Sequence, residues 1–394
     1  MTQSATLGPH LQRLQQRALM VGVGGLGLCV VGVFLNPGQF FRAYLLAYLF
    51  WLGLALGCLA IVMLHHLVRG AWGAVIQRIL EAGTRTLPLM AVLVVPLLFG
   101  LHDLYIWARP QAVANDELLR HKSLYLNVPF FMLRTGVYFL VWIGLAYGLN
   151  RWSLLHDQAQ EHLHERALRR RLQLLSGPGL VLYGITVTFA AIDWAMSLEP
   201  YWYSTIYGIV FMVGQGLATL AFAIIALALV ADFAPFADVV APAHFHDLGN
   251  LLLAFVMLWA YIAFSQFLII WSGNLPEEIP WYVHRTQGGW QWIGLVLLVF
   301  HFAVPFLLLL SRGTKRRAQT LATVALAILC MQLVDLFWLV MPAFHPAGLY
   351  VHWLDVVASL GIGGLWIAVY VWQLQRRPLL PLHEPRLQGA LDHG

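Results

Sequence analysis

The sequence predicts an all-α integral membrane protein with ten transmembrane helices. Of its 394 residues, 60% are apolar and 10% are charged, against about 45–50% and about 25% in soluble domains. Ten apolar tracts have roughly the 20-residue length that a helix needs to span a bilayer. The 16 Trp and 14 Tyr residues suit membrane interfaces, where amphipathic rings settle. Together these features exclude an ordinary soluble domain, a disordered chain and a nucleic-acid-binding protein.

The ten predicted spans are 18–35, 43–64, 87–107, 128–149, 179–196, 206–231, 248–271, 290–310, 321–341 and 350–374. The third is the least regular, because its apolar run breaks at His102 and Asp103. The first is expected to remain in the membrane, since a second span follows at once and no small-residue cleavage site is evident. Residues 1–377 thus form one polytopic transmembrane domain, and the proline-containing segment 378–394 forms a tail.

The basic residues predict the orientation. Of the 23 Lys and Arg residues, 17 fall in the termini and the even-numbered connections, and 6 fall on the other side. Basic residues accumulate on the cytoplasmic side of membrane proteins. Both termini, and therefore the tail, are predicted to be cytoplasmic.

Two cytoplasmic connections are predicted to be helical. In 71–85, apolar residues recur at helical spacing, and Gln77, Arg78 and Glu81 lie off that stripe. This pattern favours an amphipathic helix lying in the interface. The connection 150–178 reads as a solvated, charged helix that carries three consecutive arginines from Arg169.

Ionisable groups at membrane depth are the candidate functional residues, because burying them in lipid is costly. The predicted orientation gathers one set in the outer half of the membrane: Asp103, Asp193, Asp335, Asp355, Arg134 and Gln266. On the inner side, His65 and His66 end the second span, and the 232–247 connection carries His246 and Asp247 but no Lys or Arg. His301 lies near mid-bilayer, as the twelfth residue of span eight.

Two interpretations of these groups are open. Carboxylates and imidazoles can bind and release protons, so the groups can form two polar half-paths with His301 between them. Alternatively, they are ties between helices, in which Arg134 pairs with an acid and Asp193 caps a helix.

Redox cofactors are not predicted in this chain. The three cysteines lie in apolar tracts, without a haem-attachment motif or an iron–sulfur pattern. His65 and His66 lie at a different depth from His301, which disfavours bis-histidine haem ligation. A glycine run at 22–25 inside span one indicates close helix packing. No residue is therefore assigned as catalytic, cofactor-binding or metal-binding.

Four strings resemble a known family. They are LHHLVRGAWGAVIQRILEAGTRTLPLM (64–90), HKSLYLNVPFFMLRTGVYF (121–139), AIDWAMSLEPYWYSTIYG (191–208) and HDLGNLLLAFVMLWAYIAFSQFLIIWSGNLPEEIPWYVHR (246–285). They resemble the ActF subunit of bacterial alternative complex III, which is related to ActC and to NrfD/PsrC-type membrane subunits.

The resemblance implies two four-helix bundles, spans 2–5 (about 43–196) and spans 6–9 (about 206–341), flanked by spans 18–35 and 350–374. It implies a cofactor-free subunit of a respiratory or photosynthetic quinol-oxidising complex in the bacterial cytoplasmic membrane, surrounded by lipids. The expected partners are an ActC-like membrane subunit, an iron–sulfur subunit, c-type cytochrome subunits and small membrane subunits. Quinone, haem and iron–sulfur clusters would be bound by those partners.

Three functions are compatible with this resemblance. The chain can contribute a proton-conducting path. It can hold its own quinol site, with Asp103 and His102 taking protons beside an aromatic pocket. It can also be a purely structural anchor for the haem subunits. An independent transporter is disfavoured by the resemblance.

Overall fold

The computed structural model describes residues 7–158 and 162–380. This part of the chain is helical and contains no strand. The helices are α1 (Leu7–Leu35), α2 (Pro37–Val68), α3 (Ala71–Thr84), α4 (Leu87–Leu93), α5 (Val95–Phe99), α6 (Leu101–Leu104), α7 (Pro110–Asn115), α8 (Glu117–Lys122), α9 (Val128–Asp157), α10 (His162–Trp194), α11 (Tyr207–Val230), α12 (Pro242–Gly273), α13 (Ile279–Arg285), α14 (Trp290–Val296), α15 (Val304–Leu310), α16 (Arg312–Arg316), α17 (Ala318–Val340) and α18 (Trp353–Gln375).

The described residues contain ten helices, or runs of consecutive helices, that are long and apolar enough to cross a membrane. This confirms the predicted all-helical class and the predicted number of helices with membrane-spanning length and composition. Most of these helices extend beyond the predicted apolar tracts, because their polar end turns continue the helix outside the hydrocarbon-length segment. Of the predicted tail, residues 381–394 lie outside the described residues.

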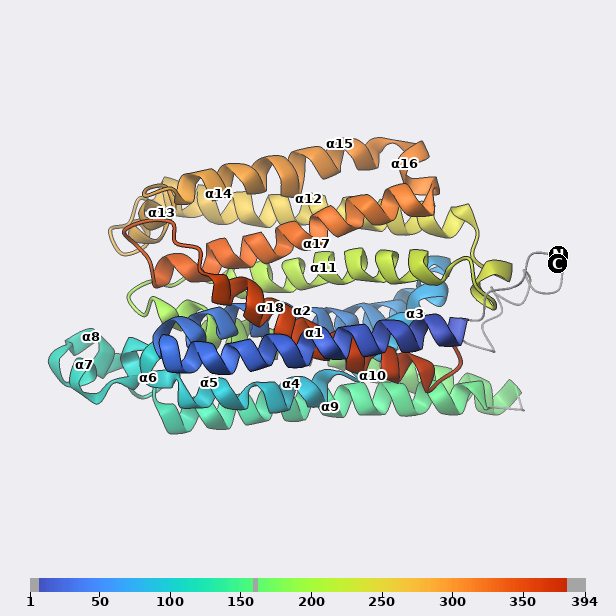
Figure 1. The fold of residues 1–394 in the computed structure, drawn as a ribbon, viewed down its shortest axis with the longest axis horizontal. Coiled ribbons are helices and arrows are strands. Elements are labelled where there is room, and N and C mark those ends of the chain that lie inside the picture. The colour runs from blue at the N-terminus through green and yellow to red at the C-terminus, as the bar shows by residue number, and fades with distance from the viewer. Residues whose placement is uncertain (1–6, 159–161, 381–394) are drawn as a thin grey trace.

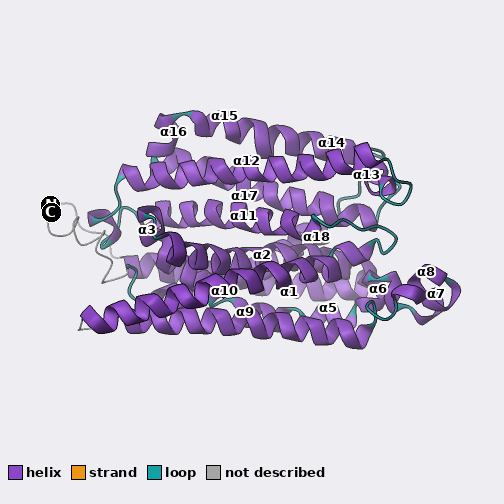
Figure 2. Cartoon of the chain, turned by 180° about the vertical axis from the view of Figure 1, so that it is seen from behind, coloured by secondary structure: helices purple, strands orange, loops and turns teal. Residues whose placement is uncertain are grey.

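The helices run side by side along one direction, so the molecule has two ends (Figure 1). We call the end that carries α6, α7, α8 and α13 the loop end, and the end that carries α3 and α16 the terminal end, because α1 begins there. Both views place α12, α14 and α15 along one edge and α9 and α10 along the opposite edge (Figure 2). Between the edges, α2 packs against α3, α10, α11 and α18, and α11 packs against α10, α12 and α17. Most of α2 and α11 is therefore buried.

The third span differs from its prediction. It runs from Trp72 to Phe99 through α3, α4 and α5, rather than over 87–107. The helix predicted at 71–85 exists, but its polar face is not solvated, since Gln77, Arg78 and Glu81 are 7%, 3% and 1% exposed. A polar face can be buried when every group finds a partner, and side chains of α9 supply these partners, as described below.

Helices α1 and α18, which lie at the two ends of the described chain, pack against each other. Gly25 of α1 lies directly against Gly361 of α18, and Gly22 lies against Gly364. Small residues at such positions let two helix backbones approach closely, and dispersion contacts then hold the pair together. The prediction that the glycine run at 22–25 marks close helix packing is thus confirmed.

Replacing Gly25 with valine is expected to separate α1 from α18. A Cβ atom at Gly25 would lie 2.7 Å from the Gly361 Cα atom, and two helix backbones cannot yield as a flexible side chain can. Overpacking of this kind costs about 1–3 kcal/mol, so thermal unfolding of the purified protein should begin at a lower temperature. Gly24→Val is the matched control, because a Cβ atom there meets nothing within 4 Å. Equal unfolding temperatures for the two variants would contradict the prediction.

Candidate functional site

The most informative membrane-depth group is Asp335 on α17. Its side chain is buried, and Oδ2 accepts hydrogen bonds from Gln332 Nε2 at 3.0 Å and from the indole Nε1 of Trp259 on α12 at 3.2 Å. Both donors are neutral. Among the described residues, no Lys, Arg or His nitrogen lies within 4 Å of this carboxylate. An acid without a cation at membrane depth is rare and is usually functional.

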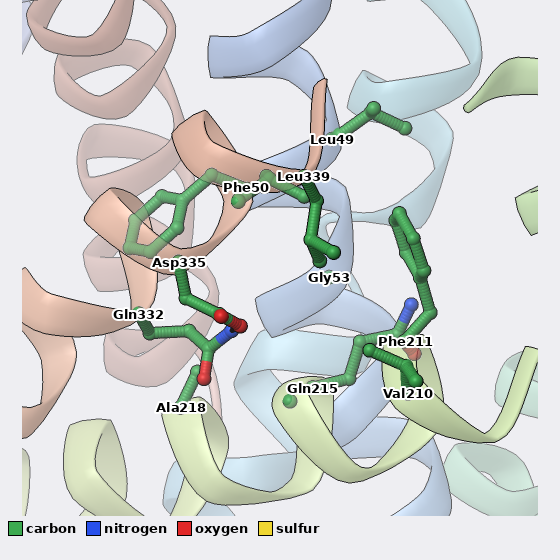
Figure 3. A pocket seen from close by; sticks show the side chains of 12 residues that line it. Leu49, Phe50, Gly53, Val210, Phe211, Gln215, Ala218, Gln332, Asp335 and Leu339 are labelled. Atoms are coloured by element: carbon green, nitrogen blue, oxygen red, sulfur yellow. Dashed lines mark hydrogen bonds between the residues drawn. The ribbon is translucent and has the colours of Figure 1, made fainter. Parts of the chain in front are cut away.

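Asp335 faces a small cavity between α2, α11 and α17 (Figure 3). The cavity has a volume of about 30 Å³, and one water molecule needs about 10–15 Å³ of such space. Gln215 of α11 lines it from the side opposite α17, and Gln215 Oε1 accepts a hydrogen bond of 2.7 Å from the Tyr183 hydroxyl of α10. The cavity thus has room for about one or two water molecules, beside polar side chains of α11 and α17.

His301 lies next to this group. It is 0% exposed, and its ring packs edge-on against Trp259, with 4.3 Å between ring centroids. Neither ring nitrogen of His301 has a hydrogen-bond partner among the described residues. The backbone around His301 is a π-helix, Leu297–Ala303, and such wide turns occur frequently at functional sites. His301 and Asp335 therefore share one neighbour, Trp259, whose ring packs against the imidazole and whose indole N–H donates to the carboxylate.

Arg134 and Asp193 form a second, different cluster. Arg134 Nε and Nη2 donate to the two carboxylate oxygens of Asp193 at 2.8 and 2.9 Å, and the Tyr138 hydroxyl donates to Oδ2 at 2.7 Å. The guanidinium also lies over the rings of Tyr125 and Phe130. Such a bidentate pair fixes geometry strongly. It ties α9 to α10, so here the structural interpretation of the two residues is the one that the contacts favour.

Two further residues of the predicted outer set lie elsewhere at the loop end. Asp355 caps α18, accepting a hydrogen bond of 2.8 Å from the His352 backbone N–H and one of 3.3 Å from Gln39 Nε2. Gln266, 3% exposed, lines a cavity of about 60 Å³ together with Glu278. In the described chain no hydrogen bond joins either residue to Asp335 or Asp193.

His102 and Asp103 are not brought to membrane depth. Both side chains are exposed on α6, after the third span has ended at Phe99. Their backbone carbonyls accept hydrogen bonds from Arg109, at 2.7 Å and 3.4 Å. The apolar run breaks there because the chain leaves the membrane-length segment.

At the terminal end, the buried face of α3 forms a network that sequence reasoning missed. Arg78 donates to Glu81 and to Ser153 Oγ and pairs with Asp157 of α9. Glu81 also accepts hydrogen bonds from Gln77 at 2.8 Å and from Ser153 at 2.6 Å. The spacing of Arg78 and Glu81 gave a signal for an ion pair, but nothing near them in the chain indicated burial.

The predicted inner histidines lie around this network. His65 and His66 of α2 line a cavity of about 50 Å³ with Ser153, His156 and Arg169. By contrast, His246 and Asp247 lie in the first turns of α12, which begins earlier than predicted, and Asp247 is exposed. The two predicted inner groups thus lie on different helices, α2 and α12.

Arg285 at the loop end was also missed. It is 1% exposed, donates to Glu199 Oε2 at 2.9 Å and to the carbonyls of Leu339 and Trp281 at 2.8 and 2.9 Å, and lies 3.6 Å from the Trp281 ring centroid. Burial lowers the pKa of its guanidinium, and the Glu199 carboxylate opposes this effect. The contacts tie α13 to the connection between α10 and α11 and to the last turn of α17.

The search of residues 7–158 and 162–380 gives no cluster of three or more His, Cys, Asp or Glu side chains suited to a metal ion. The three cysteines are free thiols; Cys29 and Cys58 are buried, whereas Cys330 is exposed. Comparison of the chain with protein-family models and with curated proteins gives no match. The fold and the site therefore define a class: an all-helical protein with ten helices of membrane-spanning length and a cation-free buried acid.

Proposed function

We propose that this chain is a cofactor-free, ActF-like membrane subunit of a quinol-oxidising electron-transfer complex, and that it conducts protons through Asp335. The observation that carries the proton path is the Asp335 carboxylate itself. It is buried at membrane depth, hydrogen-bonded by neutral donors alone and adjacent to a water-sized cavity. A carboxyl group in such surroundings can take up and release a proton, whereas the Asp193 carboxylate is held by Arg134.

A polar seam extends from this acid toward the terminal end. Thr219 follows Gln215 by one turn of α11 and donates to the Leu54 carbonyl of α2 at 3.3 Å. One turn further along α2, Cys58 packs against Gly83 of α3, two residues from Glu81. These side chains mark the direction of the route that we propose from the Arg78–Glu81 network to Asp335.

The proposal includes the two-bundle arrangement, with α2–α10 in one bundle, α11–α17 in the other, and α1 and α18 flanking them. A likeness between the last helices of the two bundles supports it. Asp193 on α10 and Asp335 on α17 are each followed seven residues later by proline, Pro200 and Pro342. Both helices also end in a 3₁₀ turn, Met196–Leu198 and Met341–Ala343.

The proposed setting is the bacterial cytoplasmic membrane, with the terminal end cytoplasmic, as the basic residues favour. The proposed partners are an ActC-like subunit, an iron–sulfur subunit and c-type cytochromes, which would bind the quinone and the redox centres. His102 and Asp103 are exposed at the loop end, so no observation favours a quinol site at these residues.

Isolation of the chain from its native membrane tests the assignment to a complex. A tagged chain is expected to co-purify with subunits that show c-type haem absorption and iron–sulfur signals, and the preparation should oxidise quinol. A chain that purifies alone, or with subunits that lack redox centres, would contradict the proposal.

A further inference from the structure

A cavity of about 220 Å³ opens at the loop end, between the end of α10 and the turn that precedes α9. Its walls include Leu124, Tyr125, Met196 and Tyr203, and most of the lining is apolar. Leu124 is 89% exposed and Tyr203 is 49% exposed, so both stand at the rim. None of the residues assigned above to the proton path lines this cavity.

Two residues that line the cavity, Lys122 and Trp202, carry hydrogen-bond donors without an acidic partner. Lys122 donates from Nζ to the Pro200 carbonyl at 2.6 Å, and no carboxylate lies within 4 Å of it among the described residues. Burial lowers the pKa of its ammonium group. The indole Nε1 of Trp202, a residue 5% exposed, has no acceptor in the described chain. Neither side chain can accept a hydrogen bond, so a fitting ligand brings acceptor oxygens.

An apolar track leads from the membrane-length part of α10 into this cavity. Ile185, Phe189, Ile192 and Met196 follow one another at helical spacing. Ile185 is 50% exposed and Phe189 is 43% exposed, while Ile192 and Met196 line the cavity. In a membrane this face of α10 contacts acyl chains, and the cavity lies where the apolar track meets a basic residue.

We propose that this cavity binds a phospholipid from the leaflet at the loop end. The phosphate accepts hydrogen bonds from Lys122 and Trp202, and one acyl chain lies along Phe189 and Ile185. A lysine ammonium group binds phosphate as a point charge. Whole-ligand pockets measure about 300–1,000 Å³, so the cavity takes only part of its occupant, and the remainder lies on the helix surface. A quinone could fill the acceptor role of the phosphate, but its neutral carbonyls leave the Lys122 charge without a counter-ion.

Native mass spectrometry of the full-length chain, isolated in mild detergent with its accompanying subunits, tests this site. The variants are Lys122→Gln, which removes the charge, and Met196→Trp, which fills the cavity. Arg120→Gln is the matched control, because Arg120 is exposed on the same helix, α8. Wild type and the control should retain one phospholipid per chain more than either test variant. Added phosphatidylglycerol should restore the lost lipid in wild type after delipidation but not in Lys122→Gln.

Equal retention by Lys122→Gln and wild type would overturn the proposal, as would a retained quinone in place of the phospholipid. If only Met196→Trp lost the lipid, the cavity would hold an acyl chain without recognising phosphate, which also overturns it. Unchanged melting temperatures would show that the Lys122→Gln loss does not come from unfolding.

Discussion

Replacing Asp335 with asparagine is expected to stop proton transfer while leaving the protein assembled. The asparagine carbonyl can still accept hydrogen bonds from Trp259 and Gln332, which now bond to the carboxylate, so the packing of α12 against α17 persists. The amide cannot bind or release a proton in the physiological range. Proton-transfer groups typically contribute about 10²–10⁴-fold to rate, and a loss of about 10²-fold or more in proton translocation is expected.

The measurement is the pH change driven by quinol oxidation after reconstitution of the complex into liposomes. Asp355→Asn is the matched control, because Asp355 is also a buried acid near the loop end but caps α18; it should retain translocation. Asp335→Glu should restore part of it. If Asp335→Asn translocated protons as wild type does, Asp335 would not lie on a proton path.

Replacing Arg134 with leucine is expected to cause the largest loss of stability. The change leaves the Asp193 carboxylate, 0% exposed, without its bidentate partner. Removing one member of a buried ion pair costs about 3–5 kcal/mol, because the other charge remains buried. Thermal unfolding of the purified protein, followed by circular dichroism, should therefore begin at a clearly lower temperature.

The control is Arg109→Leu, an exposed arginine at the same end whose loss should change the unfolding free energy by about 0.5 kcal/mol or less. The double variant Arg134→Leu/Asp193→Leu should recover much of the stability, since it removes both charges. A single variant as stable as wild type would show that Asp193 does not need Arg134.

The helices were predictable from the sequence because membrane spans are set by length and composition, which are local properties. Burial of the α3 polar face was not predictable from the sequence. Amphipathic spacing indicates that a helix has two faces, but it does not indicate what covers each face. The partner of Arg78 is Asp157, 79 positions away in the chain. Only the fold shows that α9 supplies it.

The same limit applies to the candidate site. Asp335 and His301 could be selected singly, since each is an ionisable group inside an apolar tract. That both contact Trp259, whereas Asp193 is paired with Arg134, depends on which helices pack together. His102 and Asp103 were misplaced because the broken span shifted the boundary of the third helix.

The contact between α1 and α18 has a consequence for biosynthesis. Among the helices of membrane-spanning length, α1 packs against α18 far more than against α2, and α18 follows the other described helices in the chain. At about 5–20 residues per second, the roughly 300 residues between them take roughly 15–60 s to emerge. Throughout that interval the glycine face of α1 contacts lipid or a chaperone, so α1 waits for its main packing partner until α18 has been made.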